Sequence, residues 1–266
     1  MFQSLYRMFI ELTNGRLSSG ALRRFSCSKW SRPLISSYAN AYKLNKGEID
    51  GEIDTFMTLH DLFTRRLKAG AREIDDHVSA VVSPVDGVLE DFGEVTSESR
   101  ISVKGKVYSI KEMLGADTAV SKYIGGKYMV LYLSPSHYHR IHAPVEGKVV
   151  DRWVIGKKSY PVNSMGMKYG RSPLSKNYRN ITEVQHGSGH VVIVKVGAMF
   201  VNSIVITDEA KSLSRGQEFA YFSFGSTVVL LFEKNTFKIA ESKSVPSDVR
   251  VGEKVGYIMK ESQKEG

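Results

Sequence analysis

Cysteine is almost absent from this sequence of 266 residues, in which only Cys27 occurs. One cysteine excludes an intramolecular disulfide framework and a cysteine-rich zinc module, and it is compatible with a reducing compartment. Proline is scarce too, with 7 residues, while 42% of the residues are hydrophobic and 24% are charged. This composition excludes a disordered or collagen-like chain. We therefore expect a globular protein with a sizeable core and no disulfide bonds.

Long apolar runs are also missing, and none approaches the roughly 18 residues that a transmembrane helix requires. The run at 191–201 is interrupted by Lys195, and the run at 228–232 is too short. Arg7 and Glu11 interrupt the first apolar residues, which argues against a secretory signal. The sequence therefore predicts that the protein does not span a membrane.

Acidic residues are nearly absent from residues 1–46, where eight lysines and arginines stand against Glu11 alone. The apolar residues Phe2, Leu5, Tyr6 and Phe9 follow helical spacing in this segment. A basic amphipathic helix is typical of a membrane interface, because its cations contact anionic headgroups while its apolar face enters the acyl boundary. We therefore interpret 1–46 as a basic, amphipathic, membrane-associating helical arm.

Other interpretations of this arm remain open. It can pack on the core of the protein, or it can be an organelle presequence, since it is rich in arginine and serine and nearly free of acids. It can also bind nucleic acid, but no nucleic-acid motif accompanies the charge. We therefore expect no nucleic-acid partner.

The periodicity changes after the arm. Helical spacing of apolar residues, with Gly70 as a stop signal, predicts a helix over 55–69. Apolar or alternating runs then predict strands at 78–82, 128–133, 147–155, 190–196, 203–207 and 227–232, with one short helix at 110–114. The predicted fold class is α+β and mainly β, with N-terminal amphipathic helices followed by a β-rich domain over 47–266.

Two internal echoes refine this fold. The segment 83–87 reads Ser-Pro-Val-Asp-Gly, and 143–147 reads Ala-Pro-Val-Glu-Gly. A second echo relates 216–221 to 252–257, each with a glycine at its start and a tyrosine at its end. Proline fixes φ where such a turn begins, and glycine lets the chain reverse into the next strand. The echoes are similar to the turns of barrel-sandwich (biotinyl/lipoyl-like) folds, although short motifs also recur by chance.

A histidine cluster follows one predicted strand. His137, His139 and His142 are three of the seven histidines in the chain, and they lie within six positions. Imidazole titrates near neutral pH, so the cluster indicates acid/base catalysis or a metal site. The spacing is similar to that of zinc metallohydrolases, but Ile141 stands where the aspartate of that motif is expected. We keep a zinc-dependent metallohydrolase as an alternative.

Two further motifs carry chemical groups. Asp86 lies in the Pro-Val-Asp-Gly turn, where an aspartate either forms a turn or orients a histidine. Gly225, Ser226 and Thr227 open an apolar strand, which is an ordinary way for a loop to enter a strand. A glycine carbonyl is unobstructed, however, and the next hydroxyl is close to it. The Gly225–Ser226 bond is thus a candidate for an intramolecular N-to-O acyl shift.

Taken together, the sequence resembles the phosphatidylserine decarboxylase family, and in particular its short bacterial, Bacillus-like proenzymes. The resemblance covers nearly the whole chain through ordered landmarks at 63–75, 84–87, 104–106, 138–142, 160–163, 196–198 and 225–227. It implies that Ser226 attacks the carbonyl of Gly225, so that the chain cleaves itself into a β chain, 1–225, and an α chain, 226–266. Within 47–266, the catalytic domain, it also implies a triad of Asp86, His142 and Ser226, with His139 assisting proton transfer.

The resemblance further implies a cofactor and partners. Ser226 becomes a pyruvoyl group, which forms a Schiff base with phosphatidylserine and acts as electron sink for its decarboxylation to phosphatidylethanolamine. No resident metal is expected. The expected partners are phosphatidylserine in an anionic membrane surface, the two chains of the cleaved protein and a further copy in a homo-oligomer. The expected location is peripheral, at the cytoplasmic face of the bacterial cell membrane. A non-catalytic, membrane-binding lipoyl-like module is the second alternative.

Overall fold

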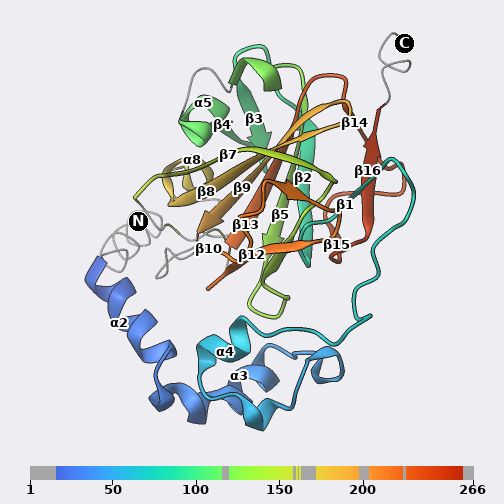
Figure 1. Ribbon diagram of the computed structural model, residues 1–266. Helices are drawn as coiled ribbons and strands as arrows, with labels where there is room; N and C mark the ends of the chain where they lie inside the picture. Colours follow the sequence, from blue (N-terminus) through green and yellow to red (C-terminus); the bar gives the residue numbers. More distant parts are fainter. Residues whose placement is uncertain are drawn as a thin grey trace.

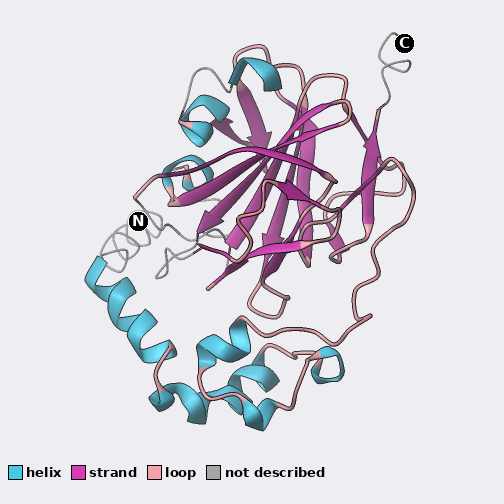
Figure 2. Ribbon diagram, in the orientation of Figure 1, coloured by secondary structure: helices cyan, strands magenta, loops and turns pink. Residues whose placement is uncertain are grey.

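The computed structural model describes residues 16–115, 120–157, 160, 162, 172–197, 204–223 and 226–259. Most of the helical residues lie before residue 64, and the strands form the body that follows (Figures 1 and 2). The fold is mainly β, with several antiparallel sheets and a few helices, which confirms the predicted class. The predicted amphipathic residues 2–9 lie outside the described residues.

The helices are short. They are α2 (Arg16–Ser26), α3 (Ile35–Ala41), α4 (Leu59–Phe63), α5 (Ile110–Leu114) and α8 (Pro173–Lys176), with 3-10 helices η1 (Lys29–Leu34), η2 (Lys46–Glu48), η3 (Ile53–Thr55) and η4 (Ser121–Tyr123). The helix predicted over 110–114 is confirmed by α5.

The predicted helix over 55–69 is wrong, because α4 spans only Leu59–Phe63. The Thr58 side chain accepts a hydrogen bond from the Asp61 N–H at 3.0 Å and so caps the first turn. Beyond the helix, Leu67 pairs with Ile49 in an isolated β-bridge. Apolar residues after α4 therefore keep helical spacing in the sequence while the chain is extended.

The strands build one large sheet and three small ones. They are β1 (Ala80–Val82), β2 (Gly87–Glu94), β3 (Arg100–Val103), β4 (Lys106–Ser109), β5 (Lys127–Leu133), β6 (Arg140–His142), β7 (Gly147–Ile155), β8 (Arg179–His186), β9 (Gly189–Gly197), β10 (Ile204–Ile206), β11 (Ser212–Leu213), β12 (Glu218–Phe222), β13 (Ser226–Phe232), β14 (Phe237–Ile239), β15 (Ser247–Val249) and β16 (Lys254–Ile258). The large sheet has the order β11-β7-β8-β9-β13-β5-β2-β15.

The central strand β13 is buried on both faces. Val228, Leu230 and Phe232 pack into one hydrophobic cluster, while Val229 and Leu231 pack into the cluster on the opposite face. A strand covered on both sides reads as a continuous apolar run, which is how β13 appears in the sequence. Every residue of β13 pairs with both β5 and β9.

The large sheet consists of two structural repeats, so the strands that follow one another from either edge to the centre correspond. Strands β15, β2, β5 and β13 correspond to β11, β7, β8 and β9. The register shifts at the equivalent place in both halves, after Leu89 in β2 and after Val149 in β7. The small sheets β1-β16-β14 and β6-β12-β10 correspond in the same way.

The first pair of echoed turns occupies equivalent positions in the two repeats. The His142 N–H donates to the Pro84 carbonyl at 2.8 Å, and the Val82 N–H donates to the Pro144 carbonyl at 3.0 Å. Each turn thus binds the strand that precedes the other turn. The echo in the sequence reflects a repeated structure rather than chance.

One repeat is inserted into the other. The inner repeat comprises β6 to β12, and the outer repeat comprises β1, β2, β5 and β13 to β16. In the inner repeat, β8 and β9 join in a tight hairpin where His186 pairs with Gly189. The equivalent pair in the outer repeat is Leu133 of β5 and Ser226 of β13. Residues 134–225 therefore replace a hairpin turn, and Ser226 is the residue at which the outer repeat resumes.

Candidate active site

Ser226 is the first residue of β13, as the sequence predicted for a strand entry at this point. Its backbone pairs with Leu133, the last residue of β5, and with Gly197, the last residue of β9. Gly225 lies outside the described residues. The candidate site thus begins where three neighbouring strands of the large sheet end or start together.

The helical part of the chain docks directly on the histidine segment. Arg65, which is 5% exposed, donates through Nη2 to the carbonyl oxygens of Ser136 and His137 at 2.9 and 3.0 Å. In the opposite direction, Arg140 Nε donates to the Thr64 carbonyl at 3.0 Å. The loop between β5 and β6 is therefore held in place by residues around α4.

His139 is completely buried beneath this helical part. Its ring lies 3.8 Å from the ring of Phe63, centroid to centroid. Burial lowers the pKa of His139 well below its usual value, and the charge of Arg65 lowers it further. Neither ring nitrogen has a hydrogen-bond partner among the described residues. The ring of His139 is therefore neutral. The backbone carbonyl of His139 accepts a hydrogen bond at 3.0 Å from the N–H of Phe222, which lies four residues before Ser226.

His142 is held by neutral groups. Its Nδ1 lies 2.8 Å from the carbonyl oxygen of Gly216, and its Nε2 lies 3.3 Å from the hydroxyl of Tyr138. Burial lowers the pKa of His142, although the Gly216 hydrogen bond and the charges of Glu218 and Asp86 act in the opposite direction. The ring is therefore neutral at neutral pH and is available as a base.

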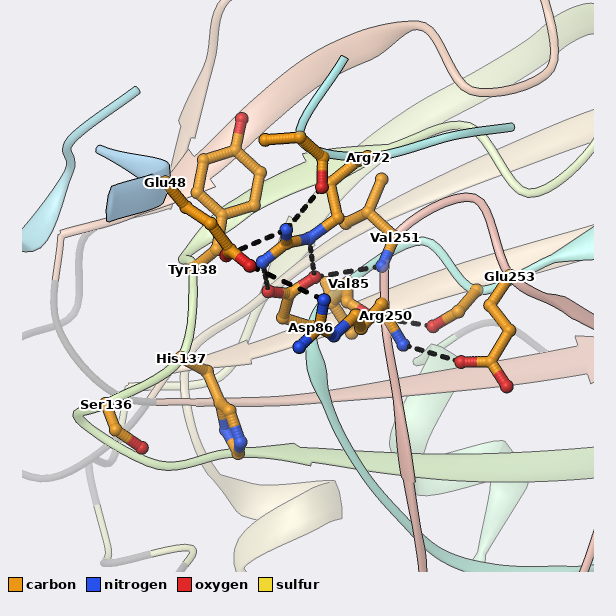
Figure 3. A network of polar contacts seen from close by, with 12 residues as sticks. Glu48, Arg72, Val85, Asp86, Ser136, His137, Tyr138, Arg250, Val251 and Glu253 are labelled. Atoms are coloured by element: carbon orange, nitrogen blue, oxygen red, sulfur yellow. Dashed lines mark hydrogen bonds and ion pairs between the residues drawn. The ribbon is translucent and has the colours of Figure 1, made fainter. Parts of the chain in front are cut away.

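Asp86 makes its hydrogen bonds elsewhere. Arg72 binds both carboxylate oxygens, Oδ1 through Nε at 2.8 Å and Oδ2 through Nη2. The Val251 N–H donates to Oδ1 at 2.9 Å. Figure 3 shows Arg72 between Asp86 and Glu48, whose Oε2 accepts from Arg72 Nη1 at 2.9 Å. A guanidinium that binds both oxygens forms stronger hydrogen bonds than a neutral imidazole does.

This arrangement corrects one expectation about Asp86. The triad would have the His142 ring donate a hydrogen bond to the Asp86 carboxylate, but this bond is not among the contacts of either residue in the described chain, because Nδ1 binds the Gly216 carbonyl and the carboxylate binds Arg72. Asp86 still acts on His142 through its charge, which raises the pKa of the imidazole. The carboxylate and the imidazole thus belong to one site without direct contact.

The three histidines do not form a metal site. The His137 ring accepts a hydrogen bond from the Ser134 N–H through Nδ1 at 2.9 Å, while His139 packs on Phe63 and His142 binds Gly216. In the parts of the chain that the structure describes, no group of three histidine, cysteine or acidic side chains could hold a metal ion. The geometry does not support the metallohydrolase alternative.

The inner and outer repeats differ at the chemically active positions. The backbone carbonyl of Ser79 accepts a hydrogen bond from the Ile258 N–H, just as the backbone carbonyl of His139 accepts one from the Phe222 N–H. The equivalents of His139, His142 and Ser226 are Ser79, Val82 and Gly189. Of the two equivalent corners, one therefore has imidazoles at the first two of these positions and a serine at the strand entry, whereas the other has serine, valine and glycine.

Other residues of the site were not predicted. Tyr138 lies within the histidine segment, yet its contact with His142 depends on how the loop folds back. His60 of α4 lies with Nε2 3.4 Å from the hydroxyl of Ser223, two residues before Gly225. A histidine in a short amphipathic helix gives no sequence signal of such a contact, because its partner lies 163 residues away.

A serine at the start of a central strand, two neutral imidazoles and a buried carboxylate are the kinds of group found in one class of protein, namely enzymes in which a hydroxyl nucleophile works with a general base. Comparison with known proteins identifies the family. Residues 59–257 match the family model described as phosphatidylserine decarboxylase. The chain belongs to the phosphatidylserine decarboxylase family.

The similar proteins match nearly the whole chain. Proteins named phosphatidylserine decarboxylase proenzyme from Anoxybacillus flavithermus and from a Geobacillus species are each 54% identical to it over 97% of its length, covering 97% and 100% of their own chains. A proenzyme of the same name from Bacillus thuringiensis is 51% identical over 96% of this chain and 97% of its own. The predicted resemblance to Bacillus-like proenzymes is confirmed.

Proposed function

We propose that the chain is made as a proenzyme, cleaves itself between Gly225 and Ser226, and then decarboxylates phosphatidylserine to phosphatidylethanolamine with a pyruvoyl group formed from Ser226. The observation that carries the proposal is the position of Ser226 at the start of β13, where the inserted repeat ends. Similarity over the full length to proteins named phosphatidylserine decarboxylase proenzyme supports the substrate and the precursor state.

In the proposed cleavage, the Ser226 hydroxyl adds to the Gly225 carbonyl carbon, and the peptide bond becomes an ester as the amide nitrogen takes a proton. Loss of the α proton of residue 226 then expels the carboxylate of the β chain, 1–225. Water adds and ammonia leaves, so that the α chain, 226–266, begins with the pyruvoyl group. We assign the base role in these steps to His142, whose protonated form is favoured by the charge of Asp86.

The surroundings of residue 226 suit such a group. Gly197, its partner in β9, has no side chain, and the ring nitrogens of His139, whose carbonyl binds the Phe222 N–H, have no partner among the described residues. When present, a pyruvoyl group supplies the electron sink for loss of CO2. We assign to His139 the transfer of a proton to the product, because imidazole is a common general acid and base and neither of its ring nitrogens is bound by another of the described residues.

The sheet supports a cleaved protein that stays together. Strand β13 of the proposed α chain pairs along its whole length with β5 and β9 of the proposed β chain. Strands β15 and β16 pair with β2 and β1. These pairings make the two chains each other's partners. The two nested repeats also support a barrel-sandwich fold of the biotinyl/lipoyl-like type for the catalytic domain, 47–266.

The proposed membrane-associating arm, 1–46, includes an exposed apolar face. Trp30 in η1 is 85% exposed, and Leu34 of the same 3-10 helix and Phe25 of α2 are exposed as well. Lys29 and Arg32 belong to the same 3-10 helix. Among the described residues, no helix is long and apolar enough to cross a bilayer. An apolar face with flanking cations suits peripheral binding to anionic lipids, and we propose the cytoplasmic face of the bacterial cell membrane as its location.

Intact-mass spectrometry under denaturing conditions tests the proposal on freshly purified protein. We expect two chains, split between Gly225 and Ser226, with the α chain blocked by a pyruvoyl group. The Ser226→Ala variant should remain one chain, whereas Ser212→Ala, which changes an exposed serine of β11, should cleave normally. A wild-type protein that stays a single chain with intact Ser226 after long incubation would contradict the proposal.

A further inference from the structure

The hydrogen bonds of His142 fix its tautomer. A carbonyl oxygen can only accept, so the nitrogen that faces the Gly216 carbonyl at 2.8 Å must carry a hydrogen. Nδ1 is therefore protonated, and in the neutral ring Nε2 carries the lone pair. The atom that faces this lone pair, at 3.3 Å, is the hydroxyl oxygen of Tyr138.

Tyr138 is itself fixed in place. It is 6% exposed, and its ring lies 5.8 Å from that of His142, centroid to centroid. Arg65 binds the carbonyls of the two residues before Tyr138, and the Phe222 N–H binds the carbonyl of the residue after it. Burial raises the pKa of Tyr138, so its hydroxyl keeps its proton and can donate to Nε2.

The repeated structure gives independent support for treating Tyr138 and His142 as a pair. In the other repeat, Val78 and Val82 take the equivalent positions, and neither can form a hydrogen bond with its side chain. Val78 is 85% exposed, in contrast to the buried Tyr138. The tyrosine and the histidine therefore occur together in the repeat that has a serine at the strand entry, and both are replaced by valine in the repeat that has glycine there.

We propose that Tyr138 is a positioning residue for the self-cleavage: its hydroxyl donates to Nε2 of the neutral His142 ring, turns its hydrogen away when Nε2 takes the proton of the Ser226 hydroxyl, and accepts from the new Nε2–H afterwards. The proposal rests on the proposed function, in which His142 is the base. Nδ1 stays bound to Gly216 in both states. Tyr138 and Gly216 thus hold the two ring nitrogens, a task for which Asp86 was expected.

The expected effect on the pKa of His142 has a definite sign. A hydrogen bond that a phenol oxygen accepts from an imidazolium is stronger than one that it donates to the neutral ring. Replacing Tyr138 with phenylalanine removes both, so the protonated form loses more and the pKa falls. The charged groups that face the pair are Glu218 of β12, Asp86 and Arg72 near the first turn, and Arg140 of β6. These groups are the same in the variant.

The Tyr138→Phe variant tests the proposal. The full chain is made by pulse-labelled cell-free synthesis, and the cleavage rate is followed by gel electrophoresis from acid to alkaline pH. We expect a rate about five- to tenfold lower than that of the wild type, as for the loss of one hydrogen bond, and a rate-pH profile shifted to lower pH. Tyr128→Phe is the matched control, because it removes another buried hydroxyl, bonded to the Ser102 carbonyl.

A second measurement separates positioning from a structural role. In uncleavable Ser226→Ala protein, NMR titration of the His142 ring should give a lower pKa when Tyr138→Phe is added, and an unchanged pKa when Tyr128→Phe is added. A Tyr138→Phe variant with an unshifted His142 pKa and pH profile would overturn the proposal, even if it cleaved slowly or unfolded more easily. If the wild-type chain does not cleave, the proposed function fails, while the NMR comparison still tests the contact.

Discussion

The ion pair between Arg72 and Asp86 is predicted to be worth more than an ordinary surface salt bridge. The two side chains are 11% and 9% exposed. Breaking such a buried pair by removing one partner costs about 3–5 kcal/mol, because the remaining charge is left in the interior. Asp86 keeps the Val251 N–H and Arg72 keeps Glu48 in the single variants, so we take the lower end, about 3 kcal/mol.

A double-mutant cycle measures this coupling. Arg72→Met, Asp86→Asn and the double variant are compared in uncleavable Ser226→Ala protein, by urea unfolding and by thermal midpoint. Each single variant should lower the midpoint by about 6–12 °C, and the second substitution should then cost little, because its partner is already absent. A coupling of less than about 1 kcal/mol, as in exposed pairs, would refute the reasoning.

Three further predictions concern charge and burial elsewhere. Acid should destabilise the protein, because the pKa of His139 is depressed: below pH 6.5 the unfolded chain takes up a proton that the buried ring does not, so the free energy of unfolding falls from there toward the lower folded-state pKa, and urea midpoints should drop in acid and depend less on pH in His139→Leu. Lys195 is buried with its pKa far below 10.5, and its Nζ lies 2.7 Å from the Thr182 hydroxyl and 5.0 Å from the centre of the Phe219 ring, so stability should rise with pH in the alkaline range, and Lys195→Met should raise the thermal midpoint and remove that slope; a lower midpoint would contradict this. Trp30→Ser should weaken sedimentation with anionic vesicles severalfold without changing the thermal midpoint, and undiminished binding would exclude Trp30 from the membrane surface.

Sequence patterns predicted the regular elements whose partners are apolar. Strand β7 spans the predicted 147–155, and β13 begins within one residue of its predicted start. Strand β8 was missed, because it carries buried polar residues. Its Arg179 is 1% exposed and donates to the carbonyls of Met113 and Asn177. Such a strand cannot be recognised by local periodicity, since the acceptors that make its burial tolerable include one 66 residues away.

For the candidate site, the sequence indicated the kinds of residue but not their contacts. Asp86 and His142 were expected to bind each other, because both follow the logic of a triad. The structure gives Asp86 to Arg72, fourteen positions earlier, and gives His142 to Gly216 and Tyr138. Several side chains and backbone groups in the folded protein can bind the same carboxylate or imidazole. Which of them does so depends on the three-dimensional arrangement, which the sequence does not give.

The insertion of one repeat into a hairpin of the other has a consequence for reversibility. Before the proposed cut, the chain folds as one molecule, and β13 reaches its place between β5 and β9 on a continuous backbone. After the cut, the same strand belongs to a separate short chain, so unfolding sets it free and refolding becomes a meeting of two molecules. The mature protein should therefore be preserved by slow unfolding, and denaturation should be irreversible for it but reversible for the precursor.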